Sequence, residues 1–456
     1  MRTLTERFLG ALVAVLFSRA FLLDGFPAPC MVSGGSMAET LLGPHYELVC
    51  PDCGFPLVCE AGGVSAGYQT VCPNCGYPLS SREAPPEIAG DRVLIDRTAL
   101  VFGPPQRWQV VAFVRPGSMG EMVVKRVVGL PGETIALCGG DVYIDGRVQR
   151  KTLAEQRAVR ILVHDAGFRP TLDPALPPRW QSTVGPTSGW QATPGGFSHR
   201  GSTAGRIDWL VYNHWRRGAT PGTTVPTPVA DLSSYNQGRA RRKEDVHPVA
   251  DLMLSVRVAE VRGGGRLWFR ASDGREEFRV EIDPGDRHFA IFREGCRPPA
   301  TEDDLPMSLG GKVFEVSLFD QQMLLAVGGR TVAAIAYDRP GGESLGTPEP
   351  LAIGCQDLDV VLDDVRVYRD IYYVRPADRD GSRPLERGVR LGDGEFFVLG
   401  DNSPISEDSR TWSEDWAVRA DQLVGRPLLV VLPVRGAWLG GRFFQVPDPR
   451  RIRYIR

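Results

Sequence analysis

The chain of 456 residues is long enough for about two to four domains. Its 53 basic and 55 acidic side chains nearly cancel, which disfavours a protein that binds nucleic acid through phosphate contacts. Hydrophobic residues make up 42% of the chain, and 52 glycines and 37 prolines accompany them. This composition favours short strands joined by turns, and it excludes a coiled coil, collagen and a protein with many membrane spans.

The N-terminal segment is apolar. Residues 8–23 carry one charged side chain, and Arg2 and Arg7 precede them. Both a membrane anchor and a cleaved signal peptide have this pattern, but no convincing cleavage site follows the run, which favours the anchor. Because residues 24–81 contain no Lys or Arg, the positive-inside rule predicts a cytoplasmic N-terminus. We therefore predict an anchor over residues 1–26 of a single-pass plasma (inner) membrane protein, with the lipid bilayer as a partner and the remaining chain extracytoplasmic.

Two Cys-x-x-Cys pairs suggest a metal site. Cys50 and Cys53 form the first pair and Cys72 and Cys75 the second, with 18 residues between the pairs. Four thiolates at this spacing are typical of a tetrahedral structural zinc, and disulfides are the alternative. Five further cysteines are an odd number, so we do not expect a complete disulfide framework. We predict a zinc ribbon over 46–85, whose closed four-thiolate site leaves no open position for catalysis.

Strand-like sequence patterns lie on both sides of a long central region, which has a different sequence pattern of its own. Outside that region, strand-like runs lie at 93–95, 110–114, 122–130, 395–399 and 428–432. The segment 142–148 reads as a hairpin, because Asp145-Gly146 suits a turn with positive φ values. From 155 to 378, alternating runs of strand length recur between turn signals, which predicts an inserted β-sandwich.

Ser36 and Lys125 are the candidates for chemistry. Ser36 lies in a Gly-rich turn, where a serine by itself is usually an ordinary turn residue. Lys125 lies in the predicted strand 122–130, and strand alternation places Val123 and Val127 on its own face. Burial among valines disfavours the ammonium form, and a neutral lysine amine can deprotonate a serine hydroxyl. The alternative is an edge lysine that reaches solvent.

Four boxes occur in order along the chain: S-G-G-S-M (33–37), G-D-R-V-L-I-D (90–96), K-R-V-V-G-L-P-G-E (125–133) and G-D-N-S-P-I-S-E-D-S-R (400–410). Together they resemble the signature boxes of bacterial type I signal peptidases, in which an N-terminal membrane anchor precedes the boxes. The resemblance covers 1–45, 88–150 and 385–440, about half of the chain.

This resemblance implies a Ser/Lys endopeptidase whose partners are the signal peptides of exported preproteins and whose catalysis needs no cofactor. It makes Ser36 the nucleophile and Lys125 the general base, and it places Ser406 where the family has a serine that orients the lysine amine. The Ser36 backbone N–H is then one oxyanion donor. The expected supporting residues are Asp401, Asp408 and Arg410.

The central region carries a second resemblance. The segment L-D-D-V-R-V-Y-R-D at 362–370 is similar to the closing strand of laminin-G-like or concanavalin-like jelly rolls. Such folds often bind carbohydrate or protein, and the alternative is a scaffold without a ligand. No ligand for this sandwich follows from the sequence.

We therefore predict a mainly β protein: a signal-peptidase-like β catalytic core after an N-terminal membrane helix, with an inserted β-sandwich (jelly roll) and a small zinc ribbon. The expected domains are the anchor (1–26), the first part of the core (27–154), the sandwich (155–378) and the second part of the core (379–456). The alternative function is a catalytically inactive, membrane-anchored binding protein whose jelly roll binds carbohydrate or protein. A Ser/Lys autoprotease of the LexA-like class is disfavoured by the anchor and by the box at 400–410.

Overall fold

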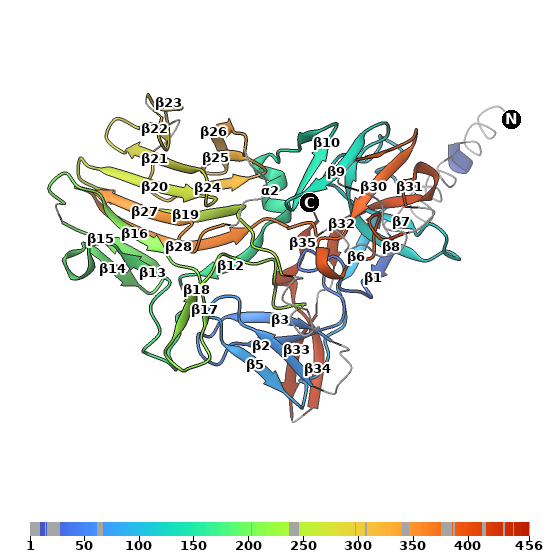
Figure 1. The fold of residues 1–456 in the computed structure, drawn as a ribbon. Coiled ribbons are helices and arrows are strands. Elements are labelled where there is room, and N and C mark those ends of the chain that lie inside the picture. Colours follow the sequence, from blue (N-terminus) through green and yellow to red (C-terminus); the bar gives the residue numbers. More distant parts are fainter. Residues whose placement is uncertain are drawn as a thin grey trace.

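The fold was analysed in a computed structural model of the chain (Figure 1). The structure describes residues 10–13, 15, 28–61, 67–201, 203–236, 246–296, 298–305, 308–339, 346–374, 385, 388–412, 416–431, 434–440 and 442–455. Over these residues the protein is mainly β, as predicted.

The first large sheet joins strands from both ends of the chain. Its order is β1-β6-β32-β7-β8-β30-β31, and β35 pairs with β32. The bounds are β1 Ala28–Met31, β6 Arg92–Asp96, β7 Val110–Val114, β8 Met122–Gly129, β30 Glu395–Leu399, β31 Val418–Arg419, β32 Leu423–Val431 and β35 Arg453–Tyr454. Strand β8 pairs antiparallel with β7 and with β30. Because Leu399 lies opposite Arg126, the segment that follows β30 begins beside the centre of β8.

A smaller sheet contains the predicted hairpin. Its order is β11-β10-β9-β29, with bounds β9 Thr134–Cys138, β10 Asp141–Ile144, β11 Arg147–Val148 and β29 Val389–Arg390. Between β10 and β11, Asp145 has a φ of 49° and Gly146 a φ of 79°. Both values are positive, as a type I′ turn requires, so the hairpin prediction is confirmed.

Two further sheets face each other as a β-sandwich, whose strands gather on the left of Figure 1. One has the order β14-β15-β28-β19-β24-β25-β26 with β12 beside β28, and the other has the order β13-β16-β27-β20-β21-β22-β23. The bounds are β12 Ile161–Asp165, β13 Trp180–Ser182, β14 Trp190–Thr193, β15 Gly196–His199, β16 Asp208–Tyr212, β19 Leu252–Arg262, β20 Arg266–Ser272, β21 Glu277–Asp283, β22 His288–Arg293, β23 Thr301–Asp304, β24 Lys312–Phe319, β25 Gln322–Val327, β26 Arg330–Ala336, β27 Leu351–Gln356 and β28 Asp359–Arg369.

One apolar core fills the space between these two sheets. Strand β20 alternates, so that Leu267, Phe269 and Ala271 are buried. The ring of Phe269 stacks on Phe314 of the opposite sheet, with 5.7 Å between ring centroids. Burial of such aromatic pairs is a main source of stability in a sandwich core. The sandwich strands run from Ile161 to Arg369 and so lie within the range expected for the insert, while the exact domain boundaries stay a prediction.

Short elements connect these units. Helix α2 (Leu153–Val159) begins at Thr152, whose hydroxyl accepts from the Glu155 N–H in a capping box. Two hairpins carry the cysteine pairs: β2 His45–Val49 with β3 Pro56–Glu60, and β4 Tyr68–Val71 with β5 Pro78–Ser81. The remaining hairpins are β17 Trp215–Arg217 with β18 Thr224–Pro226, and β33 Val434–Leu439 with β34 Arg442–Pro447.

The predicted localisation is corrected by the structure. A membrane-spanning helix needs about 20 consecutive apolar residues. Within the described parts of the chain, no helix is both long enough and apolar enough for this. This finding contradicts the prediction of a single-pass plasma membrane protein. Of the expected anchor over 1–26, all residues except 10–13 and 15 lie outside the described residues.

Candidate active site

Lys125 lies in the middle of β8 with its amine enclosed. The residue is 3% exposed, and Nζ donates a hydrogen bond to Ser406 Oγ at 3.0 Å. Burial lowers the pKa of Lys125 to about 8, against the opposing effect of the Asp408 carboxylate. At neutral pH about a tenth of such amines are uncharged, so a proton acceptor is available without a large energetic cost.

Gly400 lies where Ser406 and Ser36 meet. A Cβ added at Gly400 would lie 2.2 Å from Ser406 Oγ and 2.4 Å from the carbonyl oxygen of Ser36. Real side chains do not approach this closely, so the close approach of the two serines requires a glycine here. The loop that begins at Gly400 therefore packs directly against the residue predicted as nucleophile.

Ser36 is held in this place by its main chain. Its carbonyl oxygen accepts from the Asn402 N–H at 3.0 Å, and Asn402 Nδ2 donates to the Gly35 carbonyl at 3.0 Å. Ser36 itself is half-buried. None of the hydrogen bonds of the described residues joins the Ser36 hydroxyl to Lys125, whose amine donates to Ser406 instead. The structure thus places Ser36 and Ser406 against Gly400 and Lys125 against Ser406, and no hydrogen bond among the described residues joins Ser36 to Lys125.

Asp408 and Arg410 form a buried ion pair beneath this loop. Arg410 Nε lies 2.8 Å from Asp408 Oδ1 and Nη2 lies 2.7 Å from Oδ2. The Gly400 N–H also donates to Asp408, at 3.0 Å. Burial by itself raises the pKa of Asp408, but the Arg410 guanidinium outweighs it and holds the pKa below its usual range. Asp408 is therefore ionised and fixes the start of the loop.

A second buried ion pair lies on the other face of β8. Arg126 is fully buried and contacts Asp401 through two bonds, Nε to Oδ1 at 2.8 Å and Nη2 to Oδ2 at 2.6 Å. Asp401 Oδ2 also accepts from Thr40 Oγ1 at 2.5 Å. Asp401 thus ties β8 to the segment that follows Ser36. Strand alternation predicts that the side chains of Arg126 and Lys125 lie on opposite faces of the strand, but it predicts no partner for Arg126.

Sequence reasoning missed Asn236, which reaches the site from the central region. Its Nδ2 donates to Asn402 Oδ1 at 2.8 Å, and both residues are buried. Asn236 lies outside all four boxes, and an isolated Asn carries no signal of such a contact. Only the packing of residues 233–236 against the loop that begins at Gly400 reveals it.

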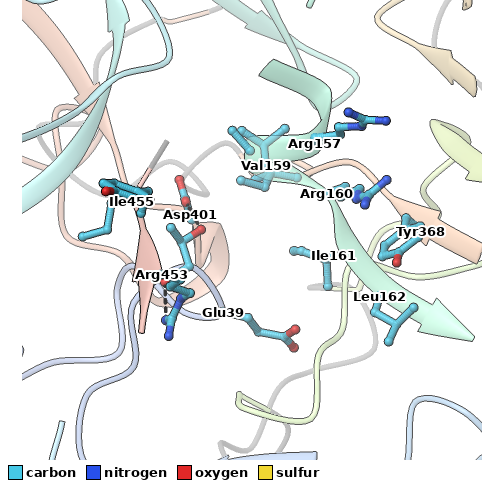
Figure 2. Close-up of a pocket in the computed structure, with 14 residues that line it drawn as sticks. Glu39, Arg157, Val159, Arg160, Ile161, Leu162, Tyr368, Asp401, Arg453 and Ile455 are labelled. Atoms are coloured by element: carbon cyan, nitrogen blue, oxygen red, sulfur yellow. Dashed lines mark hydrogen bonds between the residues drawn. The ribbon is translucent and has the colours of Figure 1, made fainter. Parts of the chain in front are cut away.

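A pocket of about 350 Å³ lies beside Asp401 (Figure 2). It is lined by Glu39, Thr40, Arg157, Ala158, Val159, Arg160, Ile161, Leu162, Tyr368, Ile371, Asp401, Arg453, Tyr454 and Ile455. Burial raises the pKa of Glu39, and the Arg369 charge opposes this. Across the pocket, Arg157 and Arg160 share the carboxylate of Glu315. The pocket walls therefore combine apolar side chains with charged groups of both signs.

The four cysteines predicted as ligands converge between the two hairpins that carry them. Cys50 Sγ lies 3.6 Å from Cys75 Sγ, and Cys53 Sγ lies 3.7 Å from Cys72 Sγ. All four sulfurs are within 4.8 Å of one another and all four residues are buried. A tetrahedral zinc with Zn–S bonds of about 2.3 Å separates its sulfurs by about 3.8 Å, whereas a disulfide brings them to about 2.05 Å. The donor set and its spacing therefore fit zinc.

Comparisons with known proteins match three of the four boxes, and the box of Ser36 at 33–37 lies outside the residues that the family model matches. A family model described as "Signal peptidase, peptidase S26" matches residues 72–178 and 353–432. Signal peptidase I of Leptolyngbya laminosa is 36% identical over 64 residues, which are 12% of this chain and 32% of that protein. A probable signal peptidase I-1 of Synechocystis sp. is 34% identical over 65 residues, 13% of this chain and 33% of that protein. The matched part spans about a third of the length of these relatives.

Solved structures are similar to the chain only at a low level. The carbohydrate-binding module CBM66 from Bacillus subtilis is 10% identical, with 43% of this chain and 99% of the module covered and a TM-score of 0.26. The apo Crh5 transglycosylase is 11% identical, with 57% and 93% covered and a TM-score of 0.30. Such scores carry no inference about this chain. The family model and the two sequence relatives support a signal peptidase family for this protein.

Proposed function

We propose that this protein is a serine endopeptidase that cleaves N-terminal signal peptides from exported preproteins, with Ser36 as the nucleophile and Lys125 as the general base. The observation that carries the proposal is the buried Lys125 amine, whose pKa of about 8 leaves part of it uncharged at neutral pH. Ser406 holds this amine, and the main chain of Ser36 lies against the same glycine as Ser406.

The proposed reaction proceeds in two stages. The neutral Lys125 amine takes the proton of the Ser36 hydroxyl while Oγ bonds to the scissile carbonyl carbon. The C–N bond of the substrate then breaks, and Lys125 returns the proton to the departing amine. In the second stage Lys125 takes a proton from a water, whose oxygen bonds to the acyl carbon of the ester on Ser36. The bond between this carbon and Ser36 Oγ then breaks, and Lys125 returns the proton to Oγ, which regenerates the hydroxyl. The backbone N–H of Ser36 is the proposed donor to the oxyanion in both stages.

The other site residues hold the reacting groups in place and do not take part in bond formation or cleavage. For the first step the Lys125 amine must turn from Ser406 Oγ toward the Ser36 hydroxyl. Ser406 keeps the amine in the buried site between turnovers, and the Asp408–Arg410 pair keeps the loop of Ser406 in place. A water-poor environment maintains the low pKa on which the mechanism depends.

The direct test is cleavage of a precursor by the purified full-length chain. The wild type should release the signal peptide, whereas Ser36→Ala and Lys125→Arg should not, because the first lacks the nucleophile and the second cannot lose its proton. Lys312→Arg, in the sandwich strand β24, is the matched control and should cleave normally. Undiminished cleavage by Lys125→Arg would contradict the proposed catalytic dyad of Ser36 and Lys125. Absence of cleavage by the wild type would favour a catalytically inactive binding protein.

We also propose that Cys50, Cys53, Cys72 and Cys75 bind one structural zinc ion. The sulfur spacing and the burial of all four residues support this. With four thiolates the metal has no open coordination position, so it supplies rigidity to the two hairpins and takes no part in peptide cleavage.

A further inference from the structure

A short turn from the central region packs into the candidate active site. Residues 233–236 lie between β18 and β19 and belong by sequence to the inserted region. All four are buried, and Tyr235 is fully inaccessible. We call residues 233–236 the inserted turn. Its burial against the peptidase core indicates that it does more than connect two strands of the insert.

The inserted turn reaches Ser36 through a chain of hydrogen bonds. Asn236 Nδ2 donates to Asn402 Oδ1 at 2.8 Å. Asn402 in turn donates from Nδ2 to the Gly35 carbonyl and from its N–H to the Ser36 carbonyl, each at 3.0 Å. The bond from Asn236 orients the Asn402 amide, because it requires an oxygen on the side of Asn236 and leaves the NH₂ group for Gly35.

Tyr235 confines the same backbone from another side. A Cβ added at Gly35 would lie 2.5 Å from Tyr235 Cε1, so the main chain just before Ser36 is in close contact with the aromatic ring. Tyr235 also belongs to a small apolar cluster with Ala38 and Leu42, which follow Ser36. The residues on both sides of Ser36 therefore pack on the inserted turn.

The two hairpins that carry the cysteine pairs, β2–β3 and β4–β5, also bind the inserted turn, and we call them together the cysteine ribbon. The Glu60 N–H donates to the Tyr235 carbonyl at 3.0 Å, and Thr70 Oγ1 donates to the Ser234 carbonyl at 2.8 Å. Glu60 ends β3 and Thr70 lies in β4, so each of the two hairpins that carry the cysteine pairs supplies one bond. The turn is thus clamped between the ribbon and the loop of Ser36.

We propose that Asn236 is a positioning residue for the nucleophile, which acts through Asn402 on the Ser36 backbone, and that the cysteine ribbon holds Asn236 in place. This inference rests on the proposed peptidase function for its kinetic consequence. The Asn236 side chain makes hydrogen bonds to Ser233 and Asn402. Within the described residues, none joins it to the side chains of Ser36 or Lys125. Its role is to keep the Ser36 loop in one conformation, so that the Ser36 hydroxyl stays in the position that the proposed reaction requires. The inserted region then becomes part of the working enzyme.

A double-mutant cycle tests the route through Asn402. Asn236→Ala should lower kcat about 10-fold with KM changed less than about twofold, because a positioning contact is lost while the substrate groove is kept. Since Asn236 acts through Asn402, Asn236→Ala in an Asn402→Ala background should lower kcat no further. The pH midpoint of kcat should not move, because the Lys125–Ser406 contact is intact. Asn213→Ala, whose amide bonds within the insert, is the matched control and should leave kcat unchanged.

Hydrogen–deuterium exchange of the full chain supplies a readout that needs no catalysis. Asn236→Ala and Thr70→Val should both speed exchange at the amides of residues 33–42, by about 10-fold, because the inserted turn no longer confines this loop. Thr70→Ser keeps the hydroxyl and should behave as the wild type. If the wild type cleaves no precursor, the proposed function fails while this exchange result still decides the positioning role. Unchanged exchange in Asn236→Ala, or additive losses in the cycle, would overturn the inference.

Discussion

The amine of Lys125 lies 3.0 Å from the hydroxyl of Ser406, although 281 positions separate the two residues in the sequence. The pairing of β8 with β30 brings them together, because the loop of Ser406 leaves the sheet directly after β30. Both side chains are buried, and Ser406 Oγ accepts the hydrogen bond of the amine. This relationship makes a low lysine pKa compatible with a stable fold.

The first prediction concerns the pH dependence of cleavage. Lys125 acts as a neutral amine, and burial sets its pKa at about 8. The neutral fraction grows as pH rises through this value, so kcat/KM should increase about tenfold per pH unit below about pH 7 and level off above about pH 9. Initial rates on a signal-peptide substrate measure this profile. A midpoint near the usual lysine pKa of about 10.4 would show that the amine is solvated and would contradict the mechanism.

The second prediction concerns Ser406. In Ser406→Ala the amine loses its hydrogen-bond acceptor and its orientation, so kcat should fall about 100-fold with little change in KM. Loss of an acceptor also disfavours the ammonium form, so the pH midpoint should move below that of the wild type. A shift of the midpoint is an effect that general loss of stability does not produce. Ser272→Ala, in the sandwich, is the control, and a normal rate in Ser406→Ala would argue against the assigned role.

The third prediction concerns the pair of Arg126 and Asp401. Asp401→Ala leaves a fully buried guanidinium without its carboxylate, which should lower the free energy of unfolding by about 3–5 kcal/mol. Urea unfolding of the full chain, followed by tryptophan fluorescence, measures the loss. The exposed pair of Glu260 and Arg262 offers the comparison, and Glu260→Ala should leave the midpoint unchanged. A loss below about 1 kcal/mol in Asp401→Ala would mean that solvent reaches Arg126.

The fourth prediction concerns the metal. The purified protein should contain one equivalent of zinc by elemental analysis, and Cys72→Ser should lose it because one of four ligands is gone. Acidification should also release the ion, since protons compete for the thiolates. Cys138→Ser changes an exposed cysteine of β9 and should retain the metal. Zinc that persists in Cys72→Ser would place the ion elsewhere.

Local patterns in the sequence were sufficient for several features. The alternation of valines around Lys125 and Arg126 predicts a strand with the two cations on opposite faces, and each cation is found in its own buried network. The Asp145-Gly146 pair predicts the hairpin, because few residues other than Gly, Asn and Asp accept two successive positive φ values. Alternating runs in the central region predict strands for the same local reason.

Other features were beyond sequence reasoning. The N-terminal run was apolar enough to suggest an anchor, but within the described residues no helix can span a membrane. The hydrogen bond from Asn236 to Asn402 joins residues 166 positions apart, and neither lies in a pattern with a period. The same holds for Thr40 and Asp401, whose contact spans 361 positions.

By itself the sequence determined several of the strands, which side of β8 each residue faces and which cysteines share a spacing, because these depend on neighbours a few positions away. The family resemblance implied the contact between Lys125 and Ser406, which the structure shows. Tertiary structure alone decided that the Ser36 carbonyl accepts from Asn402 and that residues 233–236 contact Asn402 and Gly35. These contacts arise from the order in which the strands pair and from the packing of the central region. Both depend on the burial of surface between segments that are far apart in the sequence, so a local sequence pattern does not predict them.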